Sequence, residues 1–238
     1  MKTLRSTAGP FHERPFFSQE EIEQICADEL RRAALYPATP GPVRIDRFIE
    51  KRFSIVPSYE SMGTGILGYS EFGENGVQKI VISRDLDESE THVDQRRLKT
   101  TMAHEVGHCL LHSHLFAMSA GTQSLFGPDS DVVGSKVLCR DEVGGRSTVN
   151  HGRYDGRWWE FQANQVMGAI LLPKRLVLQC LDPYLCVQGK LGMKVFNSSR
   201  REEAVRQLAE VFDVNPAVVR LRLNGLYPLN REANQLSL

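Results

Sequence analysis

Apolar residues recur at helical spacing in several stretches of the chain. The stretch at about 19–35 follows Ser18 and Glu21, which match a capping box, in which each side chain bonds the other residue's backbone amide. A second amphipathic helix is predicted from Ile45, Phe48, Ile49 and Phe53. Further helices are predicted at about 95–113, 157–172, 174–181, 200–212 and 215–223. Helices therefore dominate the expected structure.

Residues 54–84 show a different pattern, which is typical of short strands. Gly65 to Tyr69 and Val77 to Ser83 are rich in β-prone residues, and they flank the turn-forming sequence Gly73-Glu74-Asn75-Gly76. We expect a hairpin or small sheet here, and hence a mainly helical α+β fold with a small β-sheet.

Three regions are expected along the chain. Residues 1–17 are polar and interrupted by proline, which indicates a mobile N-terminal arm. Residues 18–182 are expected to form the main domain, with a Gly- and Asp-rich insertion at 115–156 that is long enough for a lid or a binding segment. Residues 183–238 are expected to form a C-terminal helical segment.

The balance of charge argues against a general attraction to anionic partners. Lys plus Arg and Asp plus Glu both number 29, so no net charge attracts nucleic acid or an anionic membrane, although a local basic patch stays compatible with these numbers. With 238 residues the chain can bury a core without disulfides or a structural metal. No signal-like or membrane-spanning apolar run is present, and five cysteines are an odd number, so we expect reduced thiols and a cytoplasmic protein.

The sequence His104-Glu105-Val106-Gly107-His108 carries the strongest chemical signal. Residues four apart on an α-helix are separated by ~6 Å along the axis and ~40° around it, so the two imidazoles converge on one point. A different side of this helix carries the apolar residues Leu98, Met102, Val106, Cys109 and Leu110. Glu105 is then placed beside a bound zinc ion to take a proton from water, as a general base does. Roughly 0.015 such motifs are expected by chance, so two solvated surface histidines are the less favoured interpretation.

A catalytic zinc ion usually has three protein ligands, so a third ligand must come from elsewhere. Glu160 lies on a second predicted helix, and Asn164, one turn later on the same face, can orient a ligand by a hydrogen bond. The competing interpretation of Glu160 is a solvated helix carboxylate. His114 is a weaker candidate, because an unbroken helix would carry it away from the metal. His112 lies on nearly the same face as His108 but too far along the helix to share one ion, so it is expected to support a ligand or to end the helix.

Three residues of the insertion also have side chains that could bind a metal ion or contact a reacting group. Cys139 could approach the metal as a thiolate if the insertion folds over the cleft, although a buried structural cysteine is favoured. His151 and Tyr154 precede the Glu160 helix and could contact a developing oxyanion. Ordinary loop positions are the favoured interpretation of both.

Four segments together resemble the ImmA/IrrE family of metallopeptidases. They are Pro42-Val43 before the helix of Ile45, Ala103 to His108 with Leu111-His112, Glu160 to Asn164, and Leu171-Leu172-Pro173. The resemblance spans roughly residues 40–225, and its two middle segments are the more specific. It implies a zincin-like α+β peptidase domain with zinc bound by His104, His108 and Glu160, and Glu105 as catalytic acid and base.

The resemblance also implies a role. Several family members are bacterial or phage-encoded and relieve repression by cleaving a helix-turn-helix transcriptional repressor, so a protein substrate of this kind is expected. This chain departs from the family in one respect, because about 50 residues separate His108 from Glu160 where many relatives have a shorter connection. Substrate access and substrate specificity are therefore the properties in which this chain is most expected to differ from the family.

Residues 204–223 resemble a helix-turn-helix, with Arg220 and Arg222 near its end. The zero net charge favours a packing hairpin or substrate-docking element over DNA binding. Two rival functions remain from the sequence alone. One is a metal-dependent regulatory module that binds a partner or DNA and cuts nothing, and the other is hydrolysis of a non-peptide amide.

Overall fold

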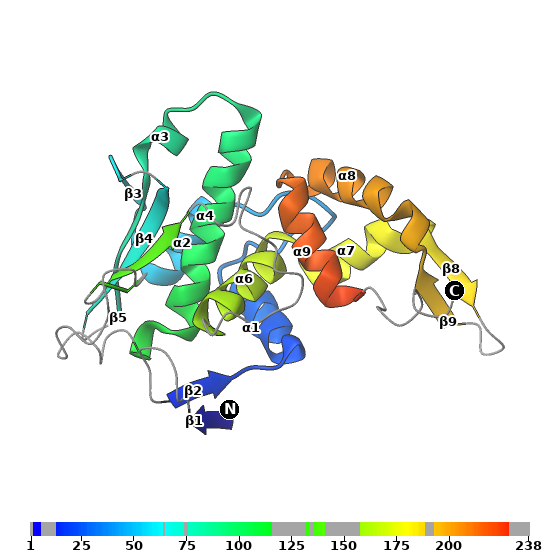
Figure 1. Cartoon of the computed structure of the whole chain (residues 1–238), viewed down its shortest axis with the longest axis horizontal. Coiled ribbons are helices and arrows are strands. Elements are labelled where there is room, and N and C mark those ends of the chain that lie inside the picture. The colour runs from blue at the N-terminus through cyan, green and yellow to red at the C-terminus, as the bar shows by residue number, and fades with distance from the viewer. Residues whose placement is uncertain are drawn as a thin grey trace, which may run out of the picture.

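The structure is a computed structural model that describes residues 2–5, 13–63, 65–73, 76–115, 132–133, 136–140, 158–188 and 193–228. Its architecture is mixed α+β, with a sheet on one side, long helices in the middle and a helical C-terminal part on the other side (Figure 1). Within the described residues, no helix is both long enough and apolar enough to cross a membrane.

The main sheet is built around the hairpin that the sequence predicts. Its five strands are β3 (Ser58–Glu60), β4 (Ile66–Gly73), β5 (Gly76–Ser83), β6 (Val132–Val133) and β7 (Lys136–Arg140), in the order β3-β5-β4-β7-β6. β4 pairs antiparallel with both β5 and β7, whereas β3 runs parallel to β5. The sheet is therefore larger than expected, because part of the predicted insertion pairs with β4.

Two helices cross beside this sheet. α4 (His92–Leu111) packs on β4 and β5, and α6 (Trp158–Leu171) packs against α4 on its other side (Figure 1). Thr91 caps the start of α4, and its hydroxyl accepts from the backbone N–H of Asp94 at 3.1 Å. α6 ends before Pro173, as predicted, because proline cannot continue a helix.

The N-terminal helix forms as the capping box predicts. In α1 (Gln19–Arg32), Ser18 Oγ accepts from Glu21 N at 3.2 Å, and Glu21 Oε2 accepts from Ser18 N at 2.8 Å. α1 packs against α6, and its buried residues include Ile22, Cys26 and Leu30 at intervals of four. The second predicted helix is α2 (Ile45–Phe53), which precedes the short α3 (Arg84–Asp87).

Strands also occur where the sequence indicates none. In the segment expected to form a mobile arm, β1 (Lys2–Arg5) pairs antiparallel with β2 (Glu13–Phe16). In the C-terminal segment, β8 (Leu185–Gln188) pairs with β9 (Met193–Phe196). Both are two-stranded sheets, and neither has the length or alternation that makes a strand evident from sequence.

The remaining helices pack onto the same core. They are α7 (Lys174–Leu181), the 3-10 turns η2 (Asp182–Tyr184) and η3 (Ser198–Arg200), α8 (Arg201–Phe212) and α9 (Pro216–Leu226). One cluster of buried hydrophobic side chains extends from Ile22 on α1 to Leu223 on α9. The C-terminal segment therefore shares its core with the segment that carries the His-Glu-x-x-His sequence.

The arginines of the helix-turn-helix-like segment bind within the chain. Arg220 donates to both carboxylate oxygens of Glu202, at 2.6 and 3.0 Å. Arg222 is buried, donates to the carbonyl of Leu172 at 3.0 Å and pairs with Glu23 on α1. These contacts favour the packing role of α8 and α9, because both guanidinium groups already have carboxylate partners.

Asp213 joins the C-terminal pair of helices to α4. It ends α8 in the left-handed conformation, with φ 51°, and its carboxylate accepts from His92 and Arg96, each at 2.9 Å, and from Lys99. Burial alone would raise the pKa of Asp213, but hydrogen bonds and charge from these three residues hold it well below its usual range. Its ionised form therefore stabilises the folded chain.

We expect Asp213→Asn to lower the free energy of unfolding by about 1–2 kcal/mol at pH 7, because three donors lose a charged acceptor. Asparagine tolerates a positive φ, so the backbone is preserved. A depressed folded pKa gives stabilisation that is full above about pH 4 and is lost as pH falls towards the folded value, so the difference from wild type should shrink below about pH 4. Urea denaturation across pH measures this.

The control for this variant is Glu203→Gln, which breaks the solvent-exposed pair of Glu203 with Arg200. This change should have a smaller effect at every pH. Equal effects of the two substitutions would contradict the special role of Asp213.

Candidate metal centre

Two histidine side chains on α4 point to one place. His104 and His108 are separated by one helical turn, and their Nε2 atoms lie 3.1 Å apart. The rings are nearly perpendicular, at 74°, and both side chains are buried, with at most 2% of each residue exposed. The interpretation as two solvated surface histidines is therefore wrong.

Glu160 on α6 completes the group. Its Oε2 lies 3.0 Å from His104 Nε2, and its Oε1 lies 3.4 Å from His108 Nε2. Ligands about 2.0–2.1 Å from a tetrahedral ion are separated by about 3.3 Å, which matches these three distances. His104, His108 and Glu160 could therefore hold a metal ion, as one ligand atom from each residue lies within 4.8 Å of the others.

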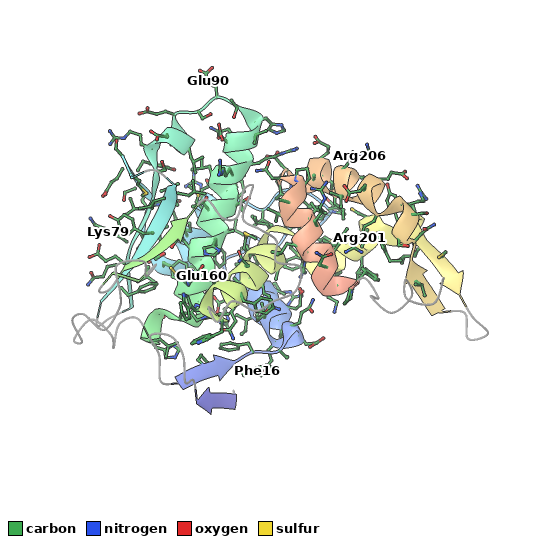
Figure 2. All side chains as sticks on the ribbon, in the orientation of Figure 1. Phe16, Lys79, Glu90, Glu160, Arg201 and Arg206 are labelled. Atoms are coloured by element: carbon green, nitrogen blue, oxygen red, sulfur yellow. The ribbon has the colours of Figure 1, made fainter. Side chains whose placement is uncertain are left out.

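The electrostatics of the group favour an ionised carboxylate. Burial disfavours the charged form of Glu160, but the imidazoles of His108 and His104 lower its pKa well below the usual range. Burial likewise disfavours charge on His104, yet its hydrogen bond and proximity to Glu160 raise its pKa. The cluster thus holds an anionic oxygen beside two imidazole nitrogens, which is the donor set of a divalent cation. In Figure 2, Glu160 is labelled on α6, whereas the labelled Lys79 on β5 and Arg206 on α8 are exposed charged residues.

The two helices that supply these ligands approach very closely at Gly107. A Cβ atom there would lie 2.7 Å from Ala163 Cα and 2.8 Å from Ala163 O. Only glycine fits, because both of these atoms belong to the backbone of α6. Gly107, the residue directly before His108 on α4, therefore determines how near Glu160 comes to the histidines.

Glu105 is buried on the side of α4 that faces the sheet. Its Oε2 accepts a hydrogen bond from Ser70 Oγ on β4 at 2.5 Å, and its Oε1 has no hydrogen-bond partner among the described residues. Burial raises the pKa of Glu105, while the charges of His108 and His104 and the bond from Ser70 oppose the shift. A carboxyl group with a raised pKa is suited to exchange protons near neutral pH.

The partner of His104 is the one expected from sequence. Asn164, one turn after Glu160 on α6, accepts from His104 Nδ1 at 3.1 Å. The bond places a ring proton on Nδ1, and Nε2 is the ring atom that faces Glu160 and His108.

His108 is linked to three further residues by hydrogen bonds, and only the first of them, His112, was expected near the site. His112 Nδ1 lies 3.2 Å from His108 Nδ1, so His112 contacts a member of the group without joining the group itself. Burial, followed by the charge of His108, lowers the pKa of His112 to about 3. Its Nε2 lies 2.9 Å from Gln162 Oε1, and Gln162 Nε2 donates to the carbonyl of Pro15 at 2.9 Å. Neither Gln162 nor Pro15 was expected at the site.

The other candidates differ in their placement. His114 is exposed and lies outside the group, although α4 ends at Leu111 rather than continuing past His114 as assumed. Cys139 lies in β7, where its backbone pairs with Gly68, and an approach of its thiolate to the metal stays a prediction. His151 and Tyr154 lie outside the described residues.

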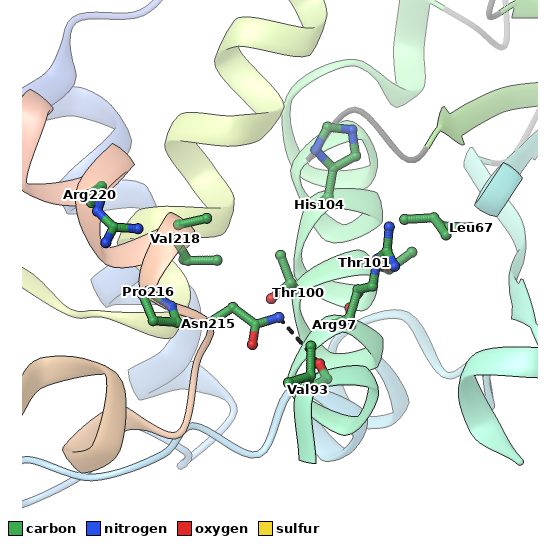
Figure 3. Close-up of a pocket in the computed structure, with 11 residues that line it drawn as sticks. Leu67, Val93, Arg97, Thr100, Thr101, His104, Asn215, Pro216, Val218 and Arg220 are labelled. Carbon is green, nitrogen blue, oxygen red and sulfur yellow. Dashed lines mark hydrogen bonds between the residues drawn. The ribbon is translucent and has the colours of Figure 1, made fainter. Parts of the chain in front are cut away.

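A cavity of about 290 Å³ adjoins His104 (Figure 3). α4 contributes Arg97, Thr100 and Thr101 to its wall, and β4 contributes Leu67. The opposite wall is the start of α9, including Pro216, Val218 and Arg220. Asn215 Nδ2 donates to the carbonyl of Val93 at 3.3 Å and closes one end (Figure 3). The lining area is mainly apolar, and the cavity extends from His104 to the start of α9.

No protein-family model matches the chain, and no curated protein matches it either.

We expect Gly107→Ala to lower the free energy of unfolding by about 3 kcal/mol and to weaken zinc binding, because the added methyl group forces α4 and α6 apart. The measurements are thermal unfolding and competition with a zinc chelator.

Gly168→Ala on α6 is the matched control, because its Cβ would meet only Arg222 Cδ, at an ordinary 3.5 Å. That change should leave stability within about 1 kcal/mol of wild type, with a gain from helix propensity. If both substitutions left zinc affinity unchanged, the close helix contact would not control the site.

Proposed function

We propose that the chain is a zinc-dependent metalloendopeptidase that cleaves a protein partner such as a helix-turn-helix transcriptional repressor. The observation that carries the proposal is the set of three buried ligand atoms at tetrahedral spacing, with the Glu105 carboxyl group on the same helix. The resemblance to the ImmA/IrrE family suggests the zincin-like class and the repressor substrate.

Zinc suits the donor set. Two imidazole nitrogens and one carboxylate oxygen are a known ligand set of catalytic zinc, and three protein ligands leave a coordination position free. A zinc ion bound there would act as a Lewis acid, polarising a carbonyl oxygen and lowering the pKa of a water molecule. The residues of the chain would orient the ligands through Asn164 and His112.

Glu105 would carry the proton. In peptide hydrolysis, a C–O bond forms between water and the carbonyl carbon and the C–N bond breaks. Glu105 takes a proton from the water as the C–O bond forms and delivers it to the leaving amine nitrogen. Its raised pKa supports both steps, and the bond from Ser70 holds one carboxylate oxygen in place, while the other is buried without a hydrogen-bond partner among the described residues.

The mainly apolar cavity beside His104 supports a peptide substrate over a small amide. A volume of about 290 Å³ can take an apolar side chain next to the scissile bond. The rival function, a metal-dependent module that cuts nothing, is favoured by the complete burial of Glu105 and its bond to Ser70. The two functions differ in whether a peptide bond is broken.

Glu105→Gln should keep one zinc ion per chain but lose cleavage by 100-fold or more, on the order of the effect of removing a general base. His104→Ala should lose both zinc and cleavage, because a three-ligand site then has two ligands. Zinc content is measured on the purified proteins, and new protein N-termini are compared in cells that express each variant.

His114→Ala is the control, because this exposed histidine lies outside the ligand group. It should retain zinc and every new N-terminus found with wild type. Full proteolysis by Glu105→Gln would remove the mechanism, and association with a repressor without any new N-terminus would favour the non-cutting module.

A further inference from the structure

A buried chain of polar groups leads from the metal ligand His108 to the N-terminal segment. It runs through His112 and Gln162 to the backbone carbonyl of Pro15 on β2, with atom separations of 3.2, 2.9 and 2.9 Å. His112 is 0% exposed and Gln162 is 2% exposed. Neither residue is a metal ligand or the general base in the proposed reaction. The question is therefore what their buried hydrogen bonds do for His108.

The chemistry of these groups determines the direction of every hydrogen bond. A carbonyl oxygen only accepts, so the amide nitrogen of Gln162 faces Pro15 and its amide oxygen faces His112. That oxygen accepts from His112 Nε2–H. Complete burial disfavours a charged imidazole, so the His112 Nδ1 atom carries a lone pair.

The same reasoning extends to the metal ligand. His112 Nδ1 accepts from His108 Nδ1–H, and a neutral His108 then has its lone pair on Nε2. This is the atom that lies 3.1 Å from His104 Nε2 and 3.4 Å from Glu160 Oε1. With the opposite tautomer, His108 would present an N–H to the metal position and could not be a ligand.

We propose that Gln162 and His112 are positioning residues that fix the tautomer of His108, and that the N-terminal strand β2 is thereby part of the metal centre. T-shaped contact with Trp158, at 5.5 Å between ring centroids, holds the His112 ring in the required orientation. His104 has a separate partner in Asn164, so each histidine ligand is oriented by its own residue of α6. The inference rests on metal binding in the proposed function, but not on peptide hydrolysis.

The direct test reads the tautomers in the full-length, metal-free protein. Two-dimensional NMR of ¹⁵N-labelled imidazoles distinguishes Nδ1–H from Nε2–H rings. We expect His108 to carry its proton on Nδ1 and His112 to carry its proton on Nε2. The reverse assignment for either ring in wild type would overturn the proposal, whether or not the protein cuts any peptide.

Two substitutions of Gln162 separate hydrogen bonding from packing. Gln162→Met keeps the length of the side chain but cannot accept from His112, so zinc should bind about 10- to 100-fold more weakly and a second His108 tautomer should become visible. Gln162→Glu, neutral when buried, can accept from His112 and donate to Pro15, so it should restore zinc affinity and the single tautomer. Gln24→Met, the same change at an exposed position of α1, should alter neither property.

The affinity is measured by competition with a zinc chelator. Equal weakening by Gln162→Met and Gln162→Glu would show a packing role and overturn the proposal. Zinc binding by Gln162→Met as tight as that of Gln24→Met would also overturn it. If Gln162→Met does not fold, the tautomers of the wild-type protein decide the question alone.

Discussion

The close contact of α4 with α6 at Gly107 is the constraint on which the candidate metal centre depends. One helix carries both histidines and Glu105, and the other carries Glu160, Gln162 and Asn164. Because the glycine lies directly against the backbone of Ala163, the two helices are close enough for the carboxylate to reach the imidazoles. The geometry of the site is therefore a property of helix packing, and the sheet, α1 and the C-terminal helices hold these two helices in place.

The helices of this fold could be predicted from local sequence. Apolar periodicity and the capping box located six helices to within a few residues, because each helix buries one face against the core. These helices are α1, α2, α6, α7, α8 and α9. The β4–β5 hairpin was predicted because its strands are eight residues long and a turn sequence lies between them. Four strands were not predicted, namely β1, β2, β8 and β9. A pair of four-residue strands takes its stability from the residues that it contacts rather than from its own sequence pattern.

The pairing of His104 with His108 could be predicted because their spacing on a helix is itself the signal. The contacts of Asn164 and His112 were foreseen for the same reason, as each lies one turn from a member of the group. Ser70 and Gln162 were missed because their partners are 35 and 50 residues away in sequence. The available clues were a serine in a β-prone segment and a glutamine in an apolar helix. Their contacts with Glu105 and His112 become evident only when α4 is packed against β4 and α6.

The ligands lie far apart along the chain, with Glu160 following His108 by 52 positions. A bound ion would therefore act as a cross-link between distant segments and would restrict the unfolded chain much as a disulfide does. The entropy of closing such a loop grows only with the logarithm of its length, so residues can be added or lost between α4 and α6, outside the paired strands β6 and β7, at small cost. The length of this connection can thus vary while a bound ion would still link the two helices.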